Sequence, residues 1–186
     1  VRSIIEQHEV IVCSANFALY EDLSQRVMNV LDRYTPRLDV YSIDEAFLDL
    51  GAVASLSLAR QRAYVADVRA TVRRWTGIPI SIGVASTKTL AKAAAEYAKK
   101  ARDAIGVYAL PGHDPTAREA LLRWLPVADV WGIGARRAAF LAGYSITTAQ
   151  DFAQADANWV RRHLTVTGAR TQLELRGVPC LPLDDP

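Results

Sequence analysis

Two runs of strand-forming residues, 37–43 and 46–50, follow each other with only Asp44 and Glu45 between them. A connection of two residues joins strands only when they are antiparallel neighbours, because a parallel crossover needs a dozen or more residues. The segment therefore predicts a β-hairpin on the rim of a sheet, with two adjacent carboxylates at its turn.

The rest of residues 1–110 alternates between helical and strand patterns. Apolar residues at helical spacing predict helices at 16–34, at 57–75 and from Ser86 or Thr87 to Lys100. Short apolar runs predict further strands at 10–13, 80–85 and 105–109, the first of them buried. The order is β-α-β-β-α-β-α-β, and its first six elements match the split β-α-β, or ferredoxin-like, pattern.

A domain boundary is expected at residues 111–115, where proline, glycine and aspartate occur together. The sequence after this linker contains only short helical patterns. The predicted fold class is α+β, with a ferredoxin-like domain over 1–110 followed by a small all-α domain over 116–178. The prolines of 179–186 indicate the start of another linker.

Composition and charge narrow the classes of function. No apolar run approaches the roughly 20 residues that span a bilayer, and the first residues do not resemble a secretory signal, so a cytosolic protein is expected. Cys13 and Cys180 are too few for a disulfide framework and lack metal-ligand spacing, so we expect two reduced, buried thiols. The net charge is only +2, so the placement of basic residues is more informative than their number.

Asp44 and Glu45 are candidate metal ligands. A hairpin would hold both carboxylates rigidly at the rim of the sheet. Mg²⁺ prefers a few carboxylate oxygens together with substrate phosphates, and two such ions can hold the attacking and leaving oxygens of a phosphoryl displacement. Considered on its chemistry alone, an Asp-Glu pair is more often a solvated turn.

The helix expected to end at Lys100 carries all the lysines of the chain. At about 100° per residue, Lys88, Lys92 and Lys99 fall at about 0°, 40° and 20°, so they form one basic stripe, while alanines supply a face that can approach a sheet closely. A solvated surface is the alternative, and it is favoured for Lys92. The segment 83–89 resembles a phosphate-binding loop but has Thr87 where that loop needs glycine, which excludes the motif.

Residues 125–141 fit a helix-hairpin-helix. Its glycines allow a tight turn, its isoleucine packs between the helices, and the free N–H groups at the start of the second helix face outward, where a DNA phosphate is the usual occupant. The candidate DNA-binding residues are Gly132, Ile133, Gly134, Arg136 and Arg137. An ordinary helix–helix turn is the alternative. Arginines at 161, 162 and 170 extend the basic surface, and Asp151, Asp156 and Glu174 are expected to dilute it.

The sequence of residues 41–49, Tyr-Ser-Ile-Asp-Glu-Ala-Phe-Leu-Asp, resembles the signature of the Y-family translesion DNA polymerases. The resemblance implies that Asp44 and Glu45 are catalytic residues that bind Mg²⁺ in a two-metal site. It also implies that Lys99 is the palm lysine that contacts the phosphates of the incoming nucleotide. A structural role suits Asp49 better, and Lys88 is expected to support the region structurally.

Further tracts resemble the UmuC-like branch of that family, the branch of the catalytic subunit of DNA polymerase V: residues 13–28, 130–134, 146–149, 161–164 and 170–177. The resemblance implies a palm over 1–110 whose N-terminal part is missing, a helix-hairpin-helix thumb over 116–178, and a linker to a little-finger domain from 179. The family's further catalytic aspartate would precede Val1, so the resemblance implies an internal piece of a longer polymerase, inactive by itself.

The activity implied is translesion DNA synthesis, a template-directed DNA nucleotidyl transfer past damaged bases in the SOS response. Implied partners are primer-template DNA, deoxynucleoside triphosphates, the processed UmuD dimer, RecA and the sliding clamp; no membrane is involved, and a cytoplasmic, nucleoid-associated protein is expected. Two alternatives stay open. A non-catalytic DNA-binding scaffold would keep a degenerate palm, and a nucleotide cyclase would share the acidic hairpin but would not need a helix-hairpin-helix.

Overall fold

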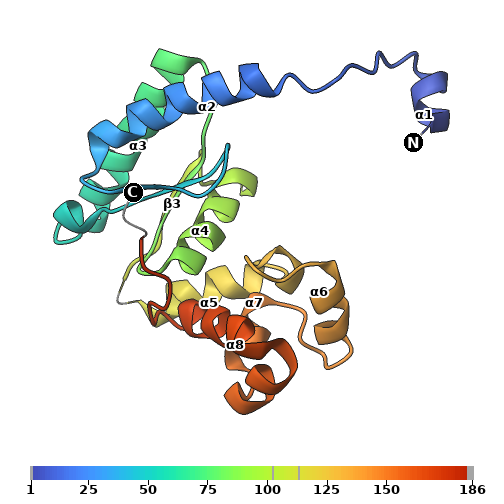
Figure 1. Ribbon diagram of the computed structural model, residues 1–186. Coiled ribbons are helices and arrows are strands. Elements are labelled where there is room, and N and C mark those ends of the chain that lie inside the picture. Colours follow the sequence, from blue (N-terminus) through green and yellow to red (C-terminus); the bar gives the residue numbers. More distant parts are fainter. Residues whose placement is uncertain (1, 102, 113, 184–186) are drawn as a thin grey trace.

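Two lobes make up the part of the chain that the computed structural model describes, residues 2–101, 103–112 and 114–183 (Figure 1). The N-terminal lobe contains α2 (Phe17–Leu31), η1 (Asp32–Tyr34), β1 (Leu38–Val40), β2 (Ala46–Leu48), η2 (Gly51–Val53), α3 (Leu58–Thr76), β3 (Ile82–Val84), α4 (Lys88–Lys100) and β4 (Val107–Ala109). The C-terminal lobe contains α5 (Pro115–Trp124), η3 (Val127–Asp129), α6 (Ala135–Ala142), α7 (Ala149–Gln154) and α8 (Ala157–Leu175). A short helix, α1 (Arg2–Gln7), stands apart at the end of an extended arm (Figure 1).

The predicted hairpin is confirmed. Strands β1 and β2 pair antiparallel, with Leu38 opposite Leu48 and Val40 opposite Ala46. The backbone N–H groups of Tyr41 and Ser42 both donate to the carbonyl of Glu45 at 3.0 Å, so the turn is longer than two residues and the strands are correspondingly shorter than expected.

A parallel pair forms the second sheet, and α4 is the crossover that connects its strands. The helix begins at Thr87, whose hydroxyl accepts the N–H of Leu90 at 3.2 Å. Strand β3 and the helix lie so close that a Cβ at Gly83 would come within 2.1 Å of the Ala95 nitrogen and 2.3 Å of the Ala91 carbonyl oxygen. The alanine face of the helix therefore packs directly on the strand, as its sequence predicts.

Helices α2 and α3 cover the other side of the strands and form the first core. Asn16 caps α2 by accepting the N–H of Leu19, and α3 ends at Gly77, whose φ of +76° is favourable only for glycine. This core contains Val27, Met28, Val30, Leu31, Val68 and Val72. The predicted helices at 16–34 and 57–75 are thus confirmed to within a few residues.

Helix α4 also contributes to the second core, which fills the C-terminal lobe. Leu90, Ala93 and Ala94 join a cluster that reaches Leu141 of α6 and Phe152 of α7. The two lobes therefore share a rigid helix, and this helix fixes their relative position. The α+β fold class with an all-α second part is confirmed.

A buried glutamate ties the end of the chain to the start of α4. Glu174, on α8, has no exposed surface, and its carboxylate accepts the backbone N–H groups of Thr89, Cys180 and Leu181 at 2.9, 2.7 and 3.2 Å. A carboxylate at a helix N-terminus is stabilised by the helix dipole. The expectation that Glu174 dilutes a basic surface is wrong, because the residue is inside the protein.

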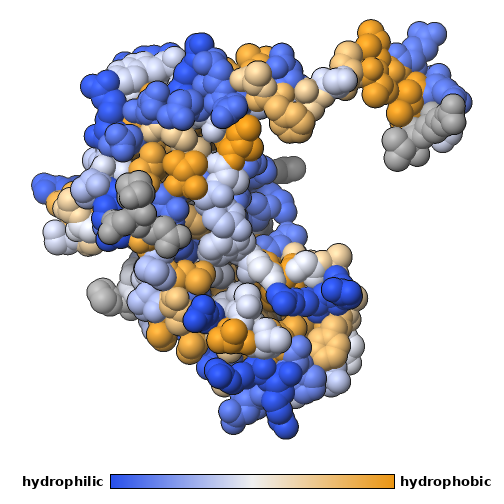
Figure 2. All heavy atoms as spheres, in the orientation of Figure 1, coloured by the Kyte–Doolittle hydropathy of each residue, from blue (hydrophilic) through white to orange (hydrophobic). Residues whose placement is uncertain are grey.

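The strand predicted at 10–13 is wrong. Residues 10–15 have no regular structure and lie on the arm, where 87% of Ile11 and 72% of Val12 are exposed. Figure 2 shows hydrophobic surface gathered on this arm. An apolar run becomes a strand only when a neighbouring strand supplies hydrogen bonds, and none of the described residues pairs with it. Cys13 is exposed as well, and Cys180 is only partly buried, so the expectation of two buried thiols is wrong; both thiols are free.

None of the described helices combines the length and the apolar character that crossing a bilayer requires.

Candidate functional site

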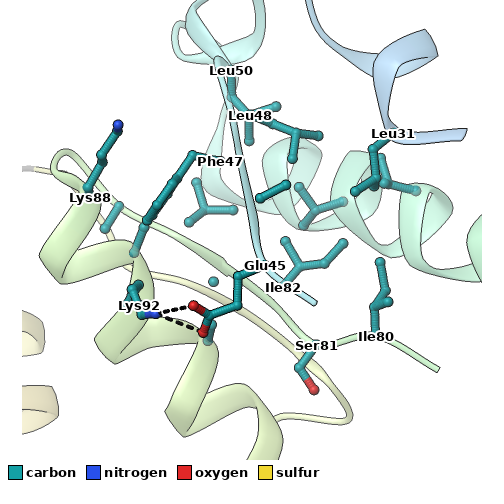
Figure 3. A pocket seen from close by; sticks show the side chains of 18 of the residues that line it. Leu31, Glu45, Phe47, Leu48, Leu50, Ile80, Ser81, Ile82, Lys88 and Lys92 are labelled. Atoms are coloured by element: carbon teal, nitrogen blue, oxygen red, sulfur yellow. Dashed lines mark hydrogen bonds and ion pairs between the residues drawn. The ribbon is translucent and has the colours of Figure 1, made fainter. Parts of the chain in front are cut away.

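A groove of about 1520 Å³ opens between the β1–β2 hairpin, helices α2 and α3, and helix α4. Apolar side chains line one part of it, and Figure 3 shows Leu31, Leu48, Ile80 and Ile82 there. Charged side chains line the part nearest α4: Asp44, Glu45, Lys88, Lys92, Glu96 and Lys99. The groove exceeds the usual 300–1,000 Å³ of a small-molecule pocket, so it has room for more than one ligand group or for further protein.

The two predicted metal ligands lie at the tip of the hairpin and face this groove. Asp44 is exposed, and its carboxylate accepts the hydroxyl of Ser42 at 2.7 Å. Glu45 is half-buried and points toward α4, where the Nζ atom of Lys92 donates to both carboxylate oxygens at 2.7 Å (Figure 3). The hairpin thus places two carboxylates side by side, one open to solvent and one held by a lysine.

Lys92 occupies the centre of the site, so the favoured expectation that it is a solvated surface residue is wrong. Only 23% of its side chain is exposed. Besides Glu45, its Nζ atom lies 5.4 Å from the ring centroid of Tyr41 and 5.2 Å from that of Trp131. Both distances are in the range of cation–π attraction. The helical stripe shared with Lys88 was the signal in the sequence for this position.

Lys88 is held by an aspartate that the sequence analysis did not single out. Its Nζ atom and a carboxylate oxygen of Asp39 lie 2.5 Å apart, with side chains only 11% and 13% exposed. The ammonium also lies 5.0 Å from the ring centroid of Phe47, which is opposite Asp39 in the hairpin. This pair fixes α4 against the hairpin, which supports the structural role expected for Lys88.

Lys99 lines the same groove but is exposed. Within the described ranges, no ion pair or hydrogen bond joins it to Asp44 or Glu45. The structure therefore brings together Glu45 and Lys92 directly, with Lys99 further along the same helix. A contact between Lys99 and a nucleotide phosphate stays a prediction.

The donor atoms fit Mg²⁺ in kind, since Asp44 and Glu45 supply carboxylate oxygens on a rigid support. They do not suffice in number. No group of three or more histidine, cysteine, aspartate or glutamate residues that could hold a metal ion occurs among the residues that the structure describes. Lys92 also occupies both oxygens of Glu45. The pair would therefore bind a cation weakly unless another ligand is added.

The predicted helix-hairpin-helix turn lies at 130–135. Gly132 has a φ of +85°, which requires glycine, whereas the φ of −78° at Gly134 is ordinary. Gly134 is the N-cap of α6, has no side chain that could cap it, and has open space where a Cβ would stand. Ile133 is buried between the helices, as predicted. Arg136 is exposed, while Arg137 donates to the carbonyl of Gly132 at 2.9 Å and supports the turn.

This turn is docked on the acidic hairpin through aromatic rings. The indole N–H of Trp131 donates to the Tyr41 hydroxyl at 3.3 Å, and the Trp131 ring lies 5.1 Å from that of Tyr41 and 5.5 Å from that of Phe47. These contacts have no signal in the sequence, because they join residues that are far apart in the chain.

An ion pair strengthens the same junction. Lys100 at the end of α4 donates to Asp129 at 3.1 Å, just before the turn. Hydrogen bonds from Lys100 to Glu96, and then to Asp129, raise the pKa of the lysine. A lysine is charged at neutral pH in any case, and the raised pKa extends the contact between α4 and η3 to higher pH.

Comparison with known proteins places the chain in a family. The model of the impB/mucB/samB family matches residues 2–96. Protein UmuC of Salmonella typhimurium is 42% identical over 177 residues, which cover 94% of this chain and 41% of UmuC. Protein ImpB of Salmonella typhimurium is 37% identical over 185 residues, which cover 100% of this chain and 43% of ImpB. DNA polymerase IV 1 of Halalkalibacterium halodurans is 29% identical over 180 residues, 95% of this chain and 40% of that protein.

Solved structures share the fold. The insertion ternary complex of Dbh DNA polymerase superposes with a TM-score of 0.75 at 24% identity, over 94% of this chain and 49% of that one. A DinB family error-prone DNA polymerase from Sulfolobus solfataricus gives a TM-score of 0.76 at 23% identity, over 94% and 51% of the two chains. The chain spans less than half the length of its sequence relatives. With the family model matched over half its length and similarity to UmuC along nearly all of it, the chain belongs to the impB/mucB/samB family.

Proposed function

We propose that this chain forms the palm and thumb of a translesion DNA polymerase. In this proposal residues 1–110 are the palm, 111–115 the linker, 116–178 the thumb, and 179–186 lead toward a little-finger domain. One observation carries the proposal: an acidic hairpin and a row of lysines face one groove, and a helix-hairpin-helix turn is docked beside it through Trp131. An acidic hairpin alone fits several classes of enzyme. Its combination with a helix-hairpin-helix turn, a motif that binds DNA, fits a polymerase.

Asp44 and Glu45 would hold the divalent cations of such a palm. When bound, Mg²⁺ supplies stabilisation of the attacking and leaving oxygens in the phosphoryl displacement. Because Lys92 donates to both oxygens of Glu45, it neutralises this carboxylate and has to share it with any cation. The family resemblance implies a further aspartate on a strand outside this sequence, and the groove of about 1520 Å³ has room for it. This chain alone is therefore proposed not to extend a primer.

The lysines of α4 would bind the triphosphate of an incoming deoxynucleotide. A positive charge near the departing pyrophosphate offsets the charge that develops there. Lys99 is the exposed member of the stripe and the residue we propose for this contact. Lys88 is committed to Asp39 and keeps its structural role.

The thumb would contact the phosphate backbone of primer-template DNA through Gly132, Ile133, Gly134, Arg136 and Arg137. Of these, Arg136 and the uncapped start of α6 face solvent, and Arg137 holds the turn in shape. Translesion synthesis in the SOS response is the activity proposed for the longer protein. The processed UmuD dimer, RecA and the sliding clamp are the proposed partners, and the cytoplasm, at the nucleoid, is the proposed location.

The DNA contact separates a polymerase from a nucleotide cyclase and is tested by binding to labelled primer-template across a salt series. The affinity of this chain should fall steeply with salt, because bound arginines displace counterions from the DNA. Replacing Arg136 and Arg137 with alanine should weaken binding and flatten the salt dependence. In the matched control, the exposed Arg73 and Arg74 on α3 are replaced with alanine, and this variant should bind DNA as the parent does. Equal losses in both variants would mean that the turn is not a specific contact.

A further inference from the structure

Four ring-bearing side chains form an aromatic cluster on the outer side of the C-terminal lobe: Phe140, Tyr144, Trp159 and His163. Phe140 lies parallel to Trp159, with ring centroids 5.9 Å apart and planes 12° apart. His163 lies 4.6 Å from Trp159, and Tyr144 lies 4.9 Å from Trp159. The cluster is thus a set of mutually packed rings contributed by α6, the turn after it, and α8.

These rings are only partly covered. The exposed fractions of Phe140 and Tyr144 are 37% and 55%, and His163 is exposed. Trp159 packs against the core of the lobe and supports the cluster from below. Buried aromatic packing alone does not account for two ring surfaces left open to solvent.

The charge around the aromatic cluster indicates what covers it. Helix α6 contains Arg136 and Arg137 and no carboxylate, and the part of α8 before its kink at Thr165 contains Arg161 and Arg162 and no carboxylate. The acidic residue just before α8, Asp156, accepts the N–H of Trp159 at 2.7 Å as the N-cap of the helix. Exposed aromatic rings with exposed arginines on the same helices are suited to bind a polyanion that carries planar aromatic groups.

The aromatic cluster also continues the surface of the helix-hairpin-helix turn. Arg136 and Phe140 are four residues apart on α6, so they lie on the same face, one turn from each other. Trp159 and Arg162 are three residues apart on α8 and are neighbours in the same way. A nucleic acid strand whose phosphate is held at Arg136 would therefore reach the rings of Phe140 and Tyr144 next.

We propose that the aromatic cluster binds unpaired DNA, with bases stacking on Phe140 and Tyr144 and phosphates paired with the neighbouring arginines. Unpaired DNA fits better than a duplex, because the faces of paired bases are covered by their neighbours and cannot meet a protein ring. The inference rests on the proposed DNA contact of the turn but goes beyond it. The proposal gives the thumb a second DNA-binding site, which is specific for single strands.

The test compares three labelled ligands: an oligothymidylate of about 12 nucleotides, an abasic strand of the same length and charge, and a blunt duplex. This chain should bind the oligothymidylate at least about tenfold more tightly than the abasic strand, since only the former can stack. Replacing Phe140 and Tyr144 together with alanine should remove this preference and leave duplex binding unchanged. The same pair replaced with leucine, which keeps apolar packing but has no ring, should behave as the alanine variant does.

Trp75→Ala is the matched control, because Trp75 is an exposed ring (51%) beside an arginine, Arg33, on the other lobe. It should leave all three affinities unchanged. Equal binding of the oligothymidylate and the abasic strand would overturn the proposal, as would a preference that survives in the leucine variant or disappears in the Trp75 control. Absence of duplex binding with a retained preference for the oligothymidylate would instead contradict the proposed contact of the turn.

Discussion

The Nζ atom of Lys92 lies 2.7 Å from both carboxylate oxygens of Glu45, and 5.4 and 5.2 Å from the ring centroids of Tyr41 and Trp131. One ammonium group therefore connects the acidic hairpin with the helix-hairpin-helix turn. The docking of the turn involves this lysine, and so would any cation that Glu45 binds. The chemistry of the site and the arrangement of the two lobes are thus physically coupled.

Lys92→Met should raise the Mg²⁺ affinity of this chain by about tenfold. The variant keeps the length of the side chain but removes the positive charge that occupies Glu45, and a charge at this distance opposes a second cation by one to a few kcal/mol. Isothermal titration with Mg²⁺ measures the effect. Arg123→Met removes a cation that is paired with Glu119 on α5, outside the groove, and serves as the control. An unchanged Mg²⁺ affinity for Lys92→Met would show that Glu45 is not a metal ligand in this chain.

Gly83→Ala should destabilise the protein by about 1–3 kcal/mol or more, because the new Cβ would meet the backbone of α4. Gly112→Ala, where a Cβ meets nothing within 4 Å, should leave stability nearly unchanged. Urea unfolding of the two variants gives the comparison. Similar stabilities for both would mean that α4 and β3 do not pack as closely as described.

Thr148 and Asp151 form a capping box at the start of α7. The pH dependence of the stability of Asp151→Asn tests it. The hydrogen bond from the backbone N–H of Thr148, together with that from Thr147, holds the pKa of Asp151 below its ordinary value of 3.8. A lowered pKa in the folded state means that the carboxylate stabilises the fold above about pH 4 and that this contribution is lost as the pH falls through the lower value. The variant should therefore lower the free energy of unfolding by about 1 kcal/mol at pH 7 and by progressively less below pH 4.

The control for this experiment is Asp22→Asn, which removes an exposed carboxylate paired with Arg26 on α2. Its cost should be close to zero, as for most surface ion pairs. Thermal unfolding between pH 3 and pH 7 measures both variants. A cost for Asp151→Asn that does not change with pH would exclude the carboxylate charge as its origin.

Glu174→Ala should lower the free energy of unfolding by about 3–5 kcal/mol. It leaves the buried N–H groups of Thr89, Cys180 and Leu181 without their acceptor. Glu174→Gln keeps one acceptor oxygen and should cost less. Denaturant unfolding ranks the two variants. Equal stability of the alanine variant and the parent would contradict the role of Glu174 as the cap of α4.

The elements that the sequence predicted well depend on local chemistry. The short link at Asp44 and Glu45 indicated a hairpin, the helical spacing of apolar residues predicted α2 and α3 to within a few residues, and the alanine face of α4 indicated close packing on a strand. Each of these features acts over a few residues, so the sequence alone contains the information.

The features that the sequence did not predict depend on distant partners. Lys92 was expected in solvent, because nothing near it in sequence shows that Glu45 and Trp131 lie within reach. The apolar run at 10–13 resembles a strand, but its pairing depends on a neighbour that the run itself does not specify. Glu174 caps a helix that begins more than eighty residues earlier, through backbone groups that have no sequence signature.

The most direct test of the proposed polymerase function is primer extension, by the longer protein that the proposal implies, with Glu45→Gln beside Asp49→Asn. The glutamine keeps the shape of Glu45 but removes its charge, so the extension rate should fall by at least about 100-fold while primer-template affinity stays within about twofold. Asp49 accepts the N–H of Gly51 at 2.8 Å, a structural bond that asparagine can also accept, so this control should extend at the parent rate. Extension by Glu45→Gln at the parent rate would contradict the assignment of the acidic hairpin as the catalytic metal site.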